Sequence, residues 1–471
     1  MVSARFRVAE APVSRSRARR WGLAGWFVPA FNAALALSLQ AGLLLSPQPA
    51  GAAEATPAEA AASAPAGKPS SARSRRPRPQ LASSAAFDAV GRLWMVGLDD
   101  ANRLIVRVAP ADQPSQFGPV RYLDQVTEPV AADGESRPKI AFGGNGQAVI
   151  AWTTPLSRPY TGNIRMIRST DGGQHFGQPF TVHQDRQLIT HRFETIAFDR
   201  SGALHVFWID KRDVEAVRGT RPAGASRGGG HADYRGAAVY RVVSRDGGAS
   251  FDPDTRLFDH SCECCRIAVA PTPEGGLAAL WRHVFEPNER DHAFAVVPPA
   301  GAPGLAQPLA GPVGEPGSRS APVRASFDRW ALDACPHHGP GLAPAISDAD
   351  PAVGWHAVWF GERAGRSAVR YGRLSHDGSP ASDAVPLPDD GAEHASIAAV
   401  GARVAIVWRS FDGEQTALRA WISNDAGRSF RLRTLALRAG DTDHPLLVQR
   451  GDQVHVFWRT RDSILVEGVI P

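Results

Sequence analysis

One short strand pattern recurs seven times between residue 80 and the C-terminus, and it constrains the fold more than any other feature of the sequence. A shorter apolar segment precedes each copy, and a third alternating segment follows most of them, with Gly and Asp turns between. Period-two alternation of β-branched and aromatic residues predicts strands, and no long helical pattern competes after residue 80. The seven copies end in or near tryptophan: "RLWMVGL" at 92, "QAVIAWT" at 147, "ALHVFWI" at 203, "GLAALWR" at 276, "WHAVWFG" at 355, "RVAIVWR" at 403 and "QVHVFWR" at 453.

Repeated antiparallel meanders of this size predict an all-β fold, a β-propeller built from four-stranded blades. A single meander cannot bury both of its faces, whereas radial stacking of several blades does so. The seven copies favour seven blades, with six as the alternative. The last copy leaves room for only three strands before Pro471, so we expect a strand near residues 75–85 to complete it and close the ring.

The basic excess of the chain is confined to its N-terminal segment. Residues 1–80 carry 11 basic and 3 acidic residues, against 41 basic and 44 acidic residues in the remainder. The predicted domain therefore has no basic surplus, and we expect no nucleic-acid partner.

The N-terminal segment has the pattern of an export signal. Arginines precede a long apolar run, and Ala50-Gly51-Ala52 fits a small-x-small cleavage site. We expect residues 1–52 to be a signal peptide, with an uncleaved membrane anchor as the alternative. Residues 53–80, rich in Ala, Pro, Ser and Arg, are predicted to be a disordered linker, and residues 81–471 the propeller. The mature chain is then expected to be periplasmic or secreted, and monomeric.

Three of the repeats end their third strand in the same way. The shared form is Ser-x-Asp-x-Gly-x-x-Phe, and a partial copy, "SHDGS", begins at residue 375. The Asp can accept hydrogen bonds from the backbone of its own turn, the Gly permits positive φ, and the Phe can pack between sheets. The three full copies are "STDGGQHF" at 169–176, "SRDGGASF" at 244–251 and "SNDAGRSF" at 423–430.

These turns resemble the BNR or Asp-box repeats of the sialidase superfamily. The segments "CECCRIAVAPTPEGGLAALWRHVFEPNERD" and "ACPHHGPGLA" are similar to an uncharacterised group of exported sialidase-like bacterial proteins with a Cys-x-Cys-Cys segment. The resemblance implies a propeller whose active site lies on the face opposite the Asp boxes. Known sialidases have six blades, so a count of seven departs from that family.

The resemblance also implies a set of catalytic residues. Sialidases hold the substrate carboxylate with an arginine cluster, use a Tyr–Glu pair as the nucleophile and use an Asp as the acid/base. This sequence departs from the sialidase pattern at two points. Arg137 and Pro138 are adjacent, whereas the Arg-Ile-Pro motif has a residue between its Arg and Pro, and no tyrosine here lies in a matching motif. The candidate positions are Arg137, Arg282, Arg409, Tyr234 and Glu215.

Cysteine and histidine gather at the segments that lead into the first strands. Only four cysteines occur, and three of them lie within four positions. Alignment of these segments places Cys265, His338, His394 and His444 at equivalent positions of four successive repeats. Such residues around one channel are suitable ligands for copper or zinc. The candidate ligands are Cys262, Cys264, Cys265, Cys335, His337, His338, His394 and His444.

Disulfide bonds are the alternative for the four cysteines, because an exported chain meets an oxidising compartment. The sequence does not choose between metal and disulfide.

The favoured function is an exported sialidase-like propeller that binds an anionic glycan, a carboxylate or a metal on the face opposite the Asp boxes. Several arginines follow the second strands and suit a bidentate anion, although the chain has only three lysines and arginine is its default cation. One alternative is an exo-sialidase-type glycoside hydrolase. Another is a periplasmic metal-binding or redox protein that uses the cysteine–histidine ring.

Overall fold

The computed structural model describes residues 80–219, 236–301, 322–332, 334, 336–346 and 350–471. The predicted signal peptide and all but the last residue of the predicted linker lie outside this part of the chain. The described residues all belong to one of the two units of the chain, Ser74–Pro471. No helix among them has the length and apolar character needed to cross a membrane.

Four of the sheets are four-stranded antiparallel meanders in which consecutive strands pair. The first contains β1 (Ser84–Phe87), β2 (Leu93–Leu98), β3 (Leu104–Ala109) and β4 (Arg121–Tyr122). The second contains β5 (Lys139–Phe142), β6 (Ala148–Pro155), β7 (Gly162–Ser169) and β8 (Phe180–Thr181). A later one contains β17 (Gly341–Pro344), β18 (Trp355–Arg363), β19 (Arg366–Leu374) and β20 (Val385–Pro386). The next contains β21 (Glu393–Val400), β22 (Arg403–Phe411), β23 (Gln415–Ser423) and β24 (Arg431–Ala439).

The middle of the chain forms one eight-stranded sheet. Its first half contains β9 (His191–Phe198), β10 (Leu204–Asp210), β11 (Ala237–Ser244) and β12 (Thr255–Ser261), with helix α1 (Arg212–Gly219) after β10. Its second half contains β13 (Ala268–Pro271), β14 (Leu277–Phe285), β15 (Glu289–Val297) and β16 (Val323–Arg324). The pair Ser261 and His283 joins the two halves. Because two of the predicted blades share this sheet, the count of seven blades stays a prediction.

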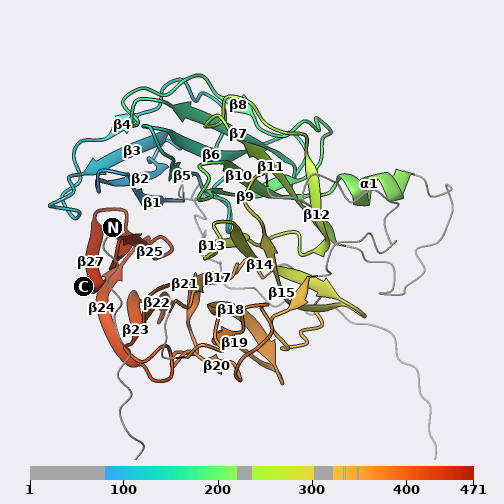
Figure 1. The fold of residues 1–471 in the computed structure, drawn as a ribbon. Coiled ribbons are helices and arrows are strands. Elements are labelled where there is room, and N and C mark those ends of the chain that lie inside the picture. Colours follow the sequence, from blue (N-terminus) through green and yellow to red (C-terminus); the bar gives the residue numbers. More distant parts are fainter. Residues whose placement is uncertain (1–79, 220–235, 302–321, 333, 335, 347–349) are drawn as a thin grey trace, which may run out of the picture. The chain divides into compact units, whose positions relative to one another are not determined.

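The first strands of the meanders contact one another in a closed cycle, which makes the fold a β-propeller. Contacts run in order through β1, β5, β9, β13, β17, β21, β25 (Leu446–Arg450) and back to β1. Figure 1 shows the sheets arranged around these strands. The repeated tryptophans fill the space between neighbouring sheets, and five of them are fully buried: Trp152, Trp208, Trp281, Trp408 and Trp458. The all-β propeller prediction is confirmed.

The prediction that a strand near residues 75–85 completes the last blade is wrong for its described part. Ser84 and Ala85 belong to β1, the first strand of its own sheet. The last sheet has three strands, β25, β26 (Gln453–Arg459) and β27 (Ile464–Ile470), and within the described residues β27 pairs only with β26. Hydrogen bonds join the two ends of the propeller instead, because Ser83 N donates to Asp443 Oδ2 at 2.5 Å and Arg459 Nη2 donates to Leu98 O at 2.9 Å.

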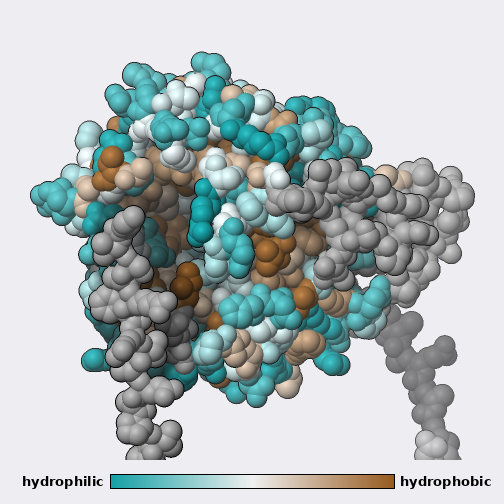
Figure 2. All heavy atoms as spheres, viewed as in Figure 1, coloured by the Kyte–Doolittle hydropathy of each residue, from teal (hydrophilic) through white to brown (hydrophobic). Residues whose placement is uncertain are grey.

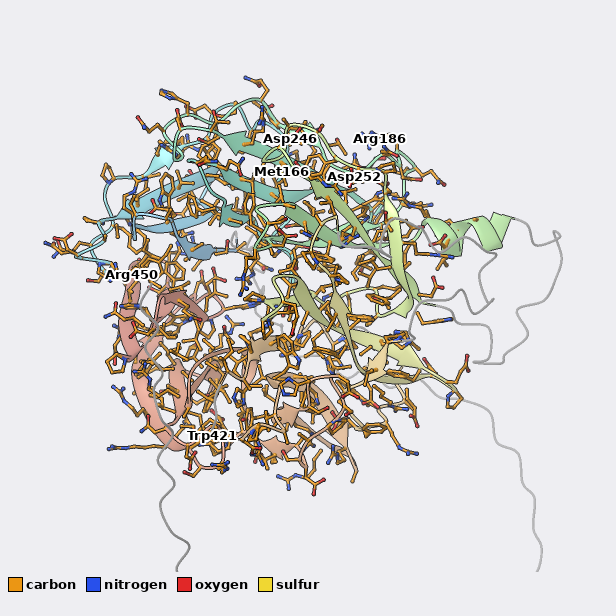
Figure 3. The ribbon with its side chains drawn as sticks, in the orientation of Figure 1. Met166, Arg186, Asp246, Asp252, Trp421 and Arg450 are labelled. Atoms are coloured by element: carbon orange, nitrogen blue, oxygen red, sulfur yellow. The ribbon has the colours of Figure 1, made fainter. Side chains whose placement is uncertain are left out.

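The turns at 169–176, 244–251 and 423–430 have the geometry expected from their shared sequence. In the second, Asp246 Oδ1 accepts hydrogen bonds from the backbone N–H of Ala249 and Ser250, both at 2.9 Å. Ser244 Oγ accepts one from Gly248 N at 2.7 Å, and Phe251 packs against a core cluster of two sheets. Asp246 is labelled in Figure 3. The three turns are local structural elements that close a hairpin.

Replacing Gly248 by alanine is expected to lower the free energy of unfolding by about 1–2 kcal/mol. Gly248 has φ +86°, and a Cβ there would meet its nearest neighbour at an ordinary 3.6 Å, so the cost comes from the backbone conformation alone. Gly468→Ala is the matched control, because nothing lies within 4 Å of its Cβ position and its φ is not positive. Urea unfolding of the two variants measures the difference, and equal stabilities would contradict the backbone explanation.

Candidate functional site

A cavity of about 500 Å³ lies where the first strands begin and the second strands end, and we call it the mouth pocket. In β22, Arg409 pairs with Glu393 at the pocket end, whereas Val404 pairs with Ser423 of the Asp-containing turn at the other end. The pocket and that turn therefore lie at opposite ends of the sheet. The polar and aromatic residues that line the pocket are Gln80, Arg137, Glu393, His394, Arg409, Phe411, Thr416, Asp441, Thr442, Asp443 and His444.

Three of the aligned histidines form a stacked column beside the pocket. The ring centroids of His394 and His444 are 3.4 Å apart with 12° between the planes, and those of His338 and His394 are 4.4 Å apart at 9°. Phe360 continues the stack against His338, with centroids 4.4 Å apart. Each histidine precedes or begins the first strand of a different sheet, so the sequence alignment of these positions corresponds to a real juxtaposition.

Glu135 anchors the column and was not among the residues predicted from the sequence. Its side chain is fully buried, and Oε1 lies 3.0 Å from Nδ1 of His394 and accepts a hydrogen bond from Gly339 N at 3.2 Å. Oε2 pairs with Arg266. Burial alone would raise the pKa of Glu135, but Arg266 and the hydrogen bond from His394 hold that pKa well below its usual range. Glu135 therefore stays ionised.

Arg137 fixes the protonation pattern of His444. Nη2 of Arg137 lies 2.5 Å from Nδ1 of His444, and Nη1 donates to Asp443 Oδ1 at 3.0 Å. Because a guanidinium can only donate, Nδ1 of His444 accepts and the imidazole proton is on Nε2. Burial and, next, the charge of Arg137 keep the pKa of His444 well below its usual range, so the imidazole is neutral.

Glu393 and Arg409 form the other side of the pocket. Arg409 Nη2 lies 3.4 Å from Glu393 Oε2, and the same oxygen lies 3.3 Å from His394 Nε2. Burial raises the pKa of Glu393, but the hydrogen bond from His394 and the charge of Arg409 outweigh it and lower the pKa to about 2. Arg409 Nη1 donates to Thr442 O at 2.7 Å, while its buried Nε has no hydrogen-bond partner.

The parallel rings of the column do not present converging lone pairs to one metal ion. Nitrogens in parallel planes 3.4 Å apart would place a shared ion well out of both ring planes, since zinc–nitrogen bonds are only about 2.0–2.1 Å long. Both nitrogens of His394 already face carboxylate oxygens. The ligand atoms of Glu135, His394 and His444 nevertheless lie within 4.8 Å of one another, as do those of His338, Glu393 and His394, so metal binding by the histidines stays a prediction.

The structure separates the predicted cysteine ligands from the histidine column. Cys262, Cys264 and Cys265 are buried in a core cluster with Trp281 and Phe193, and they form a group of their own. Their Sγ atoms lie 3.5 Å (Cys262 to Cys264) and 3.7 Å (Cys264 to Cys265) apart, beyond the roughly 2.05 Å of a disulfide bond.

Of the two remaining predicted ligands, His337 lies beside the mouth pocket, next to Gly134 of its lining. A Cβ on Gly134 would lie 2.8 Å from Nδ1 of His337, so His337 packs against the loop that carries Glu135. Cys335 lies outside the described residues.

The candidate catalytic residues are not all brought together. Arg137 and Arg409 line the mouth pocket, whereas Arg282 is buried beside it and donates to the carbonyl oxygens of His338 (3.1 Å) and Phe360 (2.7 Å). Glu215 lies on α1, and Tyr234 is outside the described residues. None of the described tyrosines lines the pocket.

A tyrosine–carboxylate pair does exist near the predicted one, in a different place. Tyr240 OH donates to Asp213 Oδ2 at 2.9 Å, and Tyr240 is 6% exposed. Burial and Asp213 raise the pKa of Tyr240 far above its usual value. Asp213 is half-buried in the first turn of α1, so the pair links this helix to β11.

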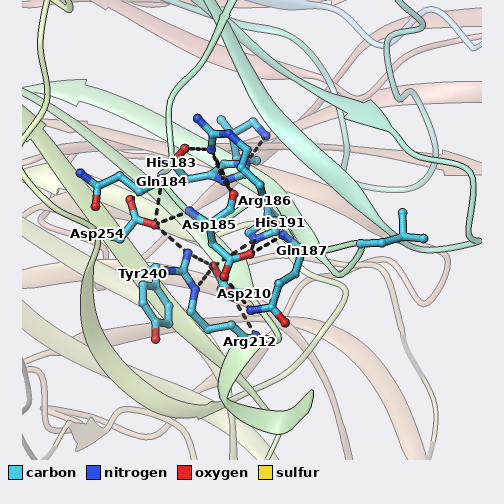
Figure 4. Close-up of polar contacts among 12 residues, drawn as sticks. His183, Gln184, Asp185, Arg186, Gln187, His191, Asp210, Arg212, Tyr240 and Asp254 are labelled. Atoms are coloured by element: carbon cyan, nitrogen blue, oxygen red, sulfur yellow. Dashed lines mark hydrogen bonds and ion pairs between the residues drawn. The ribbon is translucent and has the colours of Figure 1, made fainter. Parts of the chain in front are cut away.

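Asp210 and Arg212 of the segment "DKRD" at 210–213 belong to a polar network (Figure 4). Asp210 Oδ2 accepts hydrogen bonds from Trp208 Nε1 (2.8 Å) and Arg212 Nη2 (2.6 Å), and the same guanidinium nitrogen pairs with Asp254 at 2.8 Å. His191 stacks on His183 and lies 3.1 Å from Asp185. These groups satisfy one another, so the network supports the sheet and leaves the mouth pocket as the candidate site.

Comparison with known proteins gives structural likenesses only. No family model matches the chain, and no curated protein matches it. Solved structures with similarity include the polysaccharide lyase Uly1 (TM-score 0.46, 6% identity, 81% of this chain and 86% of that chain). A second is a Penicillium chrysogenum α-L-arabinanase complexed with arabinobiose (TM-score 0.44, 12% identity, 71% of this chain and 92% of that chain). A third is an intramolecular trans-sialidase from Ruminococcus gnavus (TM-score 0.42, 10% identity, 71% of this chain and 93% of that chain). At these TM-scores the likenesses carry no argument, and the fold assignment rests on the sheet topology.

Proposed function

We propose that this protein is an exported binding propeller that holds a small anionic ligand, a sugar bearing a carboxylate, in the mouth pocket. The observation that carries the proposal is the meeting of Arg137 and Arg409 in one cavity beside His394 and His444. Arginines from separate sheets can grip a carboxylate with paired N–H groups, which discriminates a planar anion from a neutral ligand.

The pocket offers hydrogen-bond donors that are not already used, and its volume suits a small sugar. Arg409 has a buried Nε without a partner, and His444 has its proton on Nε2 because Arg137 occupies Nδ1. A volume of about 500 Å³ is within the usual range of small-molecule pockets. Phe411, 57% exposed on the pocket lining, offers an apolar face against which a sugar ring can pack. Glu393 and Asp443 can accept hydrogen bonds from sugar hydroxyls.

Arg409→Gln is expected to weaken binding of an acidic sugar by tenfold or more, because a buried charge-assisted contact is lost, roughly 2 kcal/mol or above. Isothermal titration with N-acetylneuraminic acid and glucuronic acid, against glucose, measures this. Arg403→Gln is the matched control, since Arg403 lies at the other end of the same strand and donates to the carbonyl oxygens of Asp452 (3.3 Å) and Pro471.

The titration distinguishes an anion site from a neutral-sugar site and from a hydrolase. Equal loss in both variants, or equal binding of glucose and the acids, would contradict an anion site at the pocket. Release of sugar from a sialoside by the wild-type chain would replace binding by hydrolysis as the function.

A further inference from the structure

We infer that Cys262, Cys264 and Cys265 form a binding site for copper(I), separate from the mouth pocket. The three residues lie between β12 and β13, beside the single pair of residues that joins the two halves of the eight-stranded sheet. Their exposed fractions are 1%, 3% and 3%. Three thiols from one short segment are thus held together in the interior, at the junction of two meanders.

The sulfur atoms have the spacing of a shared metal ion. Their ligand atoms all lie within 4.8 Å of one another, and two of the separations are 3.5 and 3.7 Å. Three sulfurs about 2.3 Å from one ion would be roughly 3.8–4.0 Å apart, so small side-chain movements suffice. A disulfide between neighbouring Cys264 and Cys265 would instead need a strained eight-membered ring.

Positive charge surrounds the thiols, as thiolate ligands require. Arg290 Nη1 donates to Cys262 Sγ at 3.4 Å. Arg282, 1% exposed, has two nitrogens, Nε and Nη1, without a hydrogen-bond partner, and Cys262 N donates to its carbonyl oxygen at 2.9 Å. Glu263 is ion-paired with Lys211 and so does not cancel this charge. A buried guanidinium with unused donors is costly unless a negative group faces it, and thiolates at this position meet that need.

The donor set favours copper(I) over zinc. Thiolates are soft ligands that select copper(I), and copper(I) accepts a set of three sulfurs, whereas structural zinc almost always takes four ligands. The described residues that cluster here offer three sulfurs. The interior position also shields a soft ion from water.

The site is distinct from the one under Proposed function. The ligand atoms of the three cysteines form one group, and those of His338, His394 and His444 belong to others, although Arg282 Nη2 donates to the carbonyl oxygen of His338. The two proposals therefore fail independently, since a copper measurement does not depend on sugar binding.

The test is anaerobic loading of the purified, reduced full chain with copper(I) alone, followed by removal of loose metal with a chelator and measurement of bound copper. One equivalent is expected for the wild type. Cys264→Ser is expected to retain almost none, and His394→Gln, the control in the histidine column, is expected to retain one. Arg282→Gln is expected to weaken copper affinity by roughly tenfold or more while leaving all three sulfurs in place.

X-ray absorption on the loaded wild type provides a measurement that does not depend on the folding of any variant. Three sulfur neighbours at about 2.3 Å support the site. Loss of copper in His394→Gln but not in Cys264→Ser would overturn it, as would absence of binding, nitrogen-dominated coordination, or displacement of copper(I) by equimolar zinc. A disulfide within the three cysteines of the protein isolated without reductant would also overturn it.

Discussion

Replacing Glu135 by alanine is expected to lower the free energy of unfolding at pH 7 by about 3–5 kcal/mol, the largest effect of any single change near the pocket. Glu135 is fully buried, pairs with Arg266 and lies 3.0 Å from Nδ1 of His394. It also accepts a hydrogen bond from Gly339 N. Its removal leaves Nδ1 of His394 and the backbone N–H of Gly339 without their acceptor in the interior, whereas Arg266, 22% exposed, keeps its hydrogen bond to Ala395 O. Losing a buried acceptor costs more than the pair itself contributed.

Urea unfolding measures the effect, with Glu128→Ala as the matched control. Glu128 pairs with Arg165 at 2.7 Å, but both side chains are 21% exposed. Water can replace a partner at such a position, so the control is expected to lose no more than about 1 kcal/mol. Equal losses in the two variants would show that Glu135 is not the anchor of the column. The loss of unfolding free energy in Glu135→Gln is expected to lie between those of Glu135→Ala and Glu128→Ala, because the amide keeps an acceptor oxygen but loses the charge.

The fold was predictable from the sequence because the repeat depends on periodicity alone. Alternation, a tryptophan in each second strand and the Asp-containing turns are local properties, and all of them appear in the structure. The closure of the ring was not predictable in this way. It depends on Ser83, Asp443 and Arg459, whose side chains join residues more than 350 positions apart in the chain.

The sequence predicted where the candidate site lies, but not which of its side chains face the pocket and which face the core. Alignment placed Cys265 and His394 at equivalent positions, yet the cysteine is buried in a core cluster while the histidine stacks in the column. The register of β21 shifts between Glu393 and Ser396, and His394 has φ +52°. Such a bulge changes which side chains face inward, and a period-two pattern does not record it. Glu135 lies in a loop before β5 and belongs to no repeated pattern, so nothing in the sequence marked it.

Lowering the pH from 6.5 to 4.5 is expected to destabilise the protein steeply, before Glu135 or Glu393 is protonated. Burial, and next the neighbouring His394, lower the pKa of His338 to about 4, and burial and Arg137 hold the pKa of His444 well below its usual range. Glu135, Glu393 and Arg282 also face His338, and the carboxylates only partly offset the burial. In the unfolded chain these histidines have a pKa near 6.5. Below that pH the unfolded state therefore binds more protons than the folded state, which favours unfolding.

The direction of the change in unfolding free energy with pH follows from the lowered pKa values of His338 and His444 in the folded protein. The stability is complete above the unfolded pKa and falls as the pH drops towards the folded pKa, by up to about 1.4 kcal/mol per pH unit for each histidine that stays neutral. His338→Gln removes one such group, so its unfolding free energy is expected to change less steeply with pH than that of the wild type, by about that amount. His175→Gln is the control, because the His175 side chain is 86% exposed. Urea unfolding at half-unit intervals between pH 6.5 and 4.5 measures the slopes. A slope in His338→Gln equal to that of the wild type would mean that His338 is charged in the folded protein.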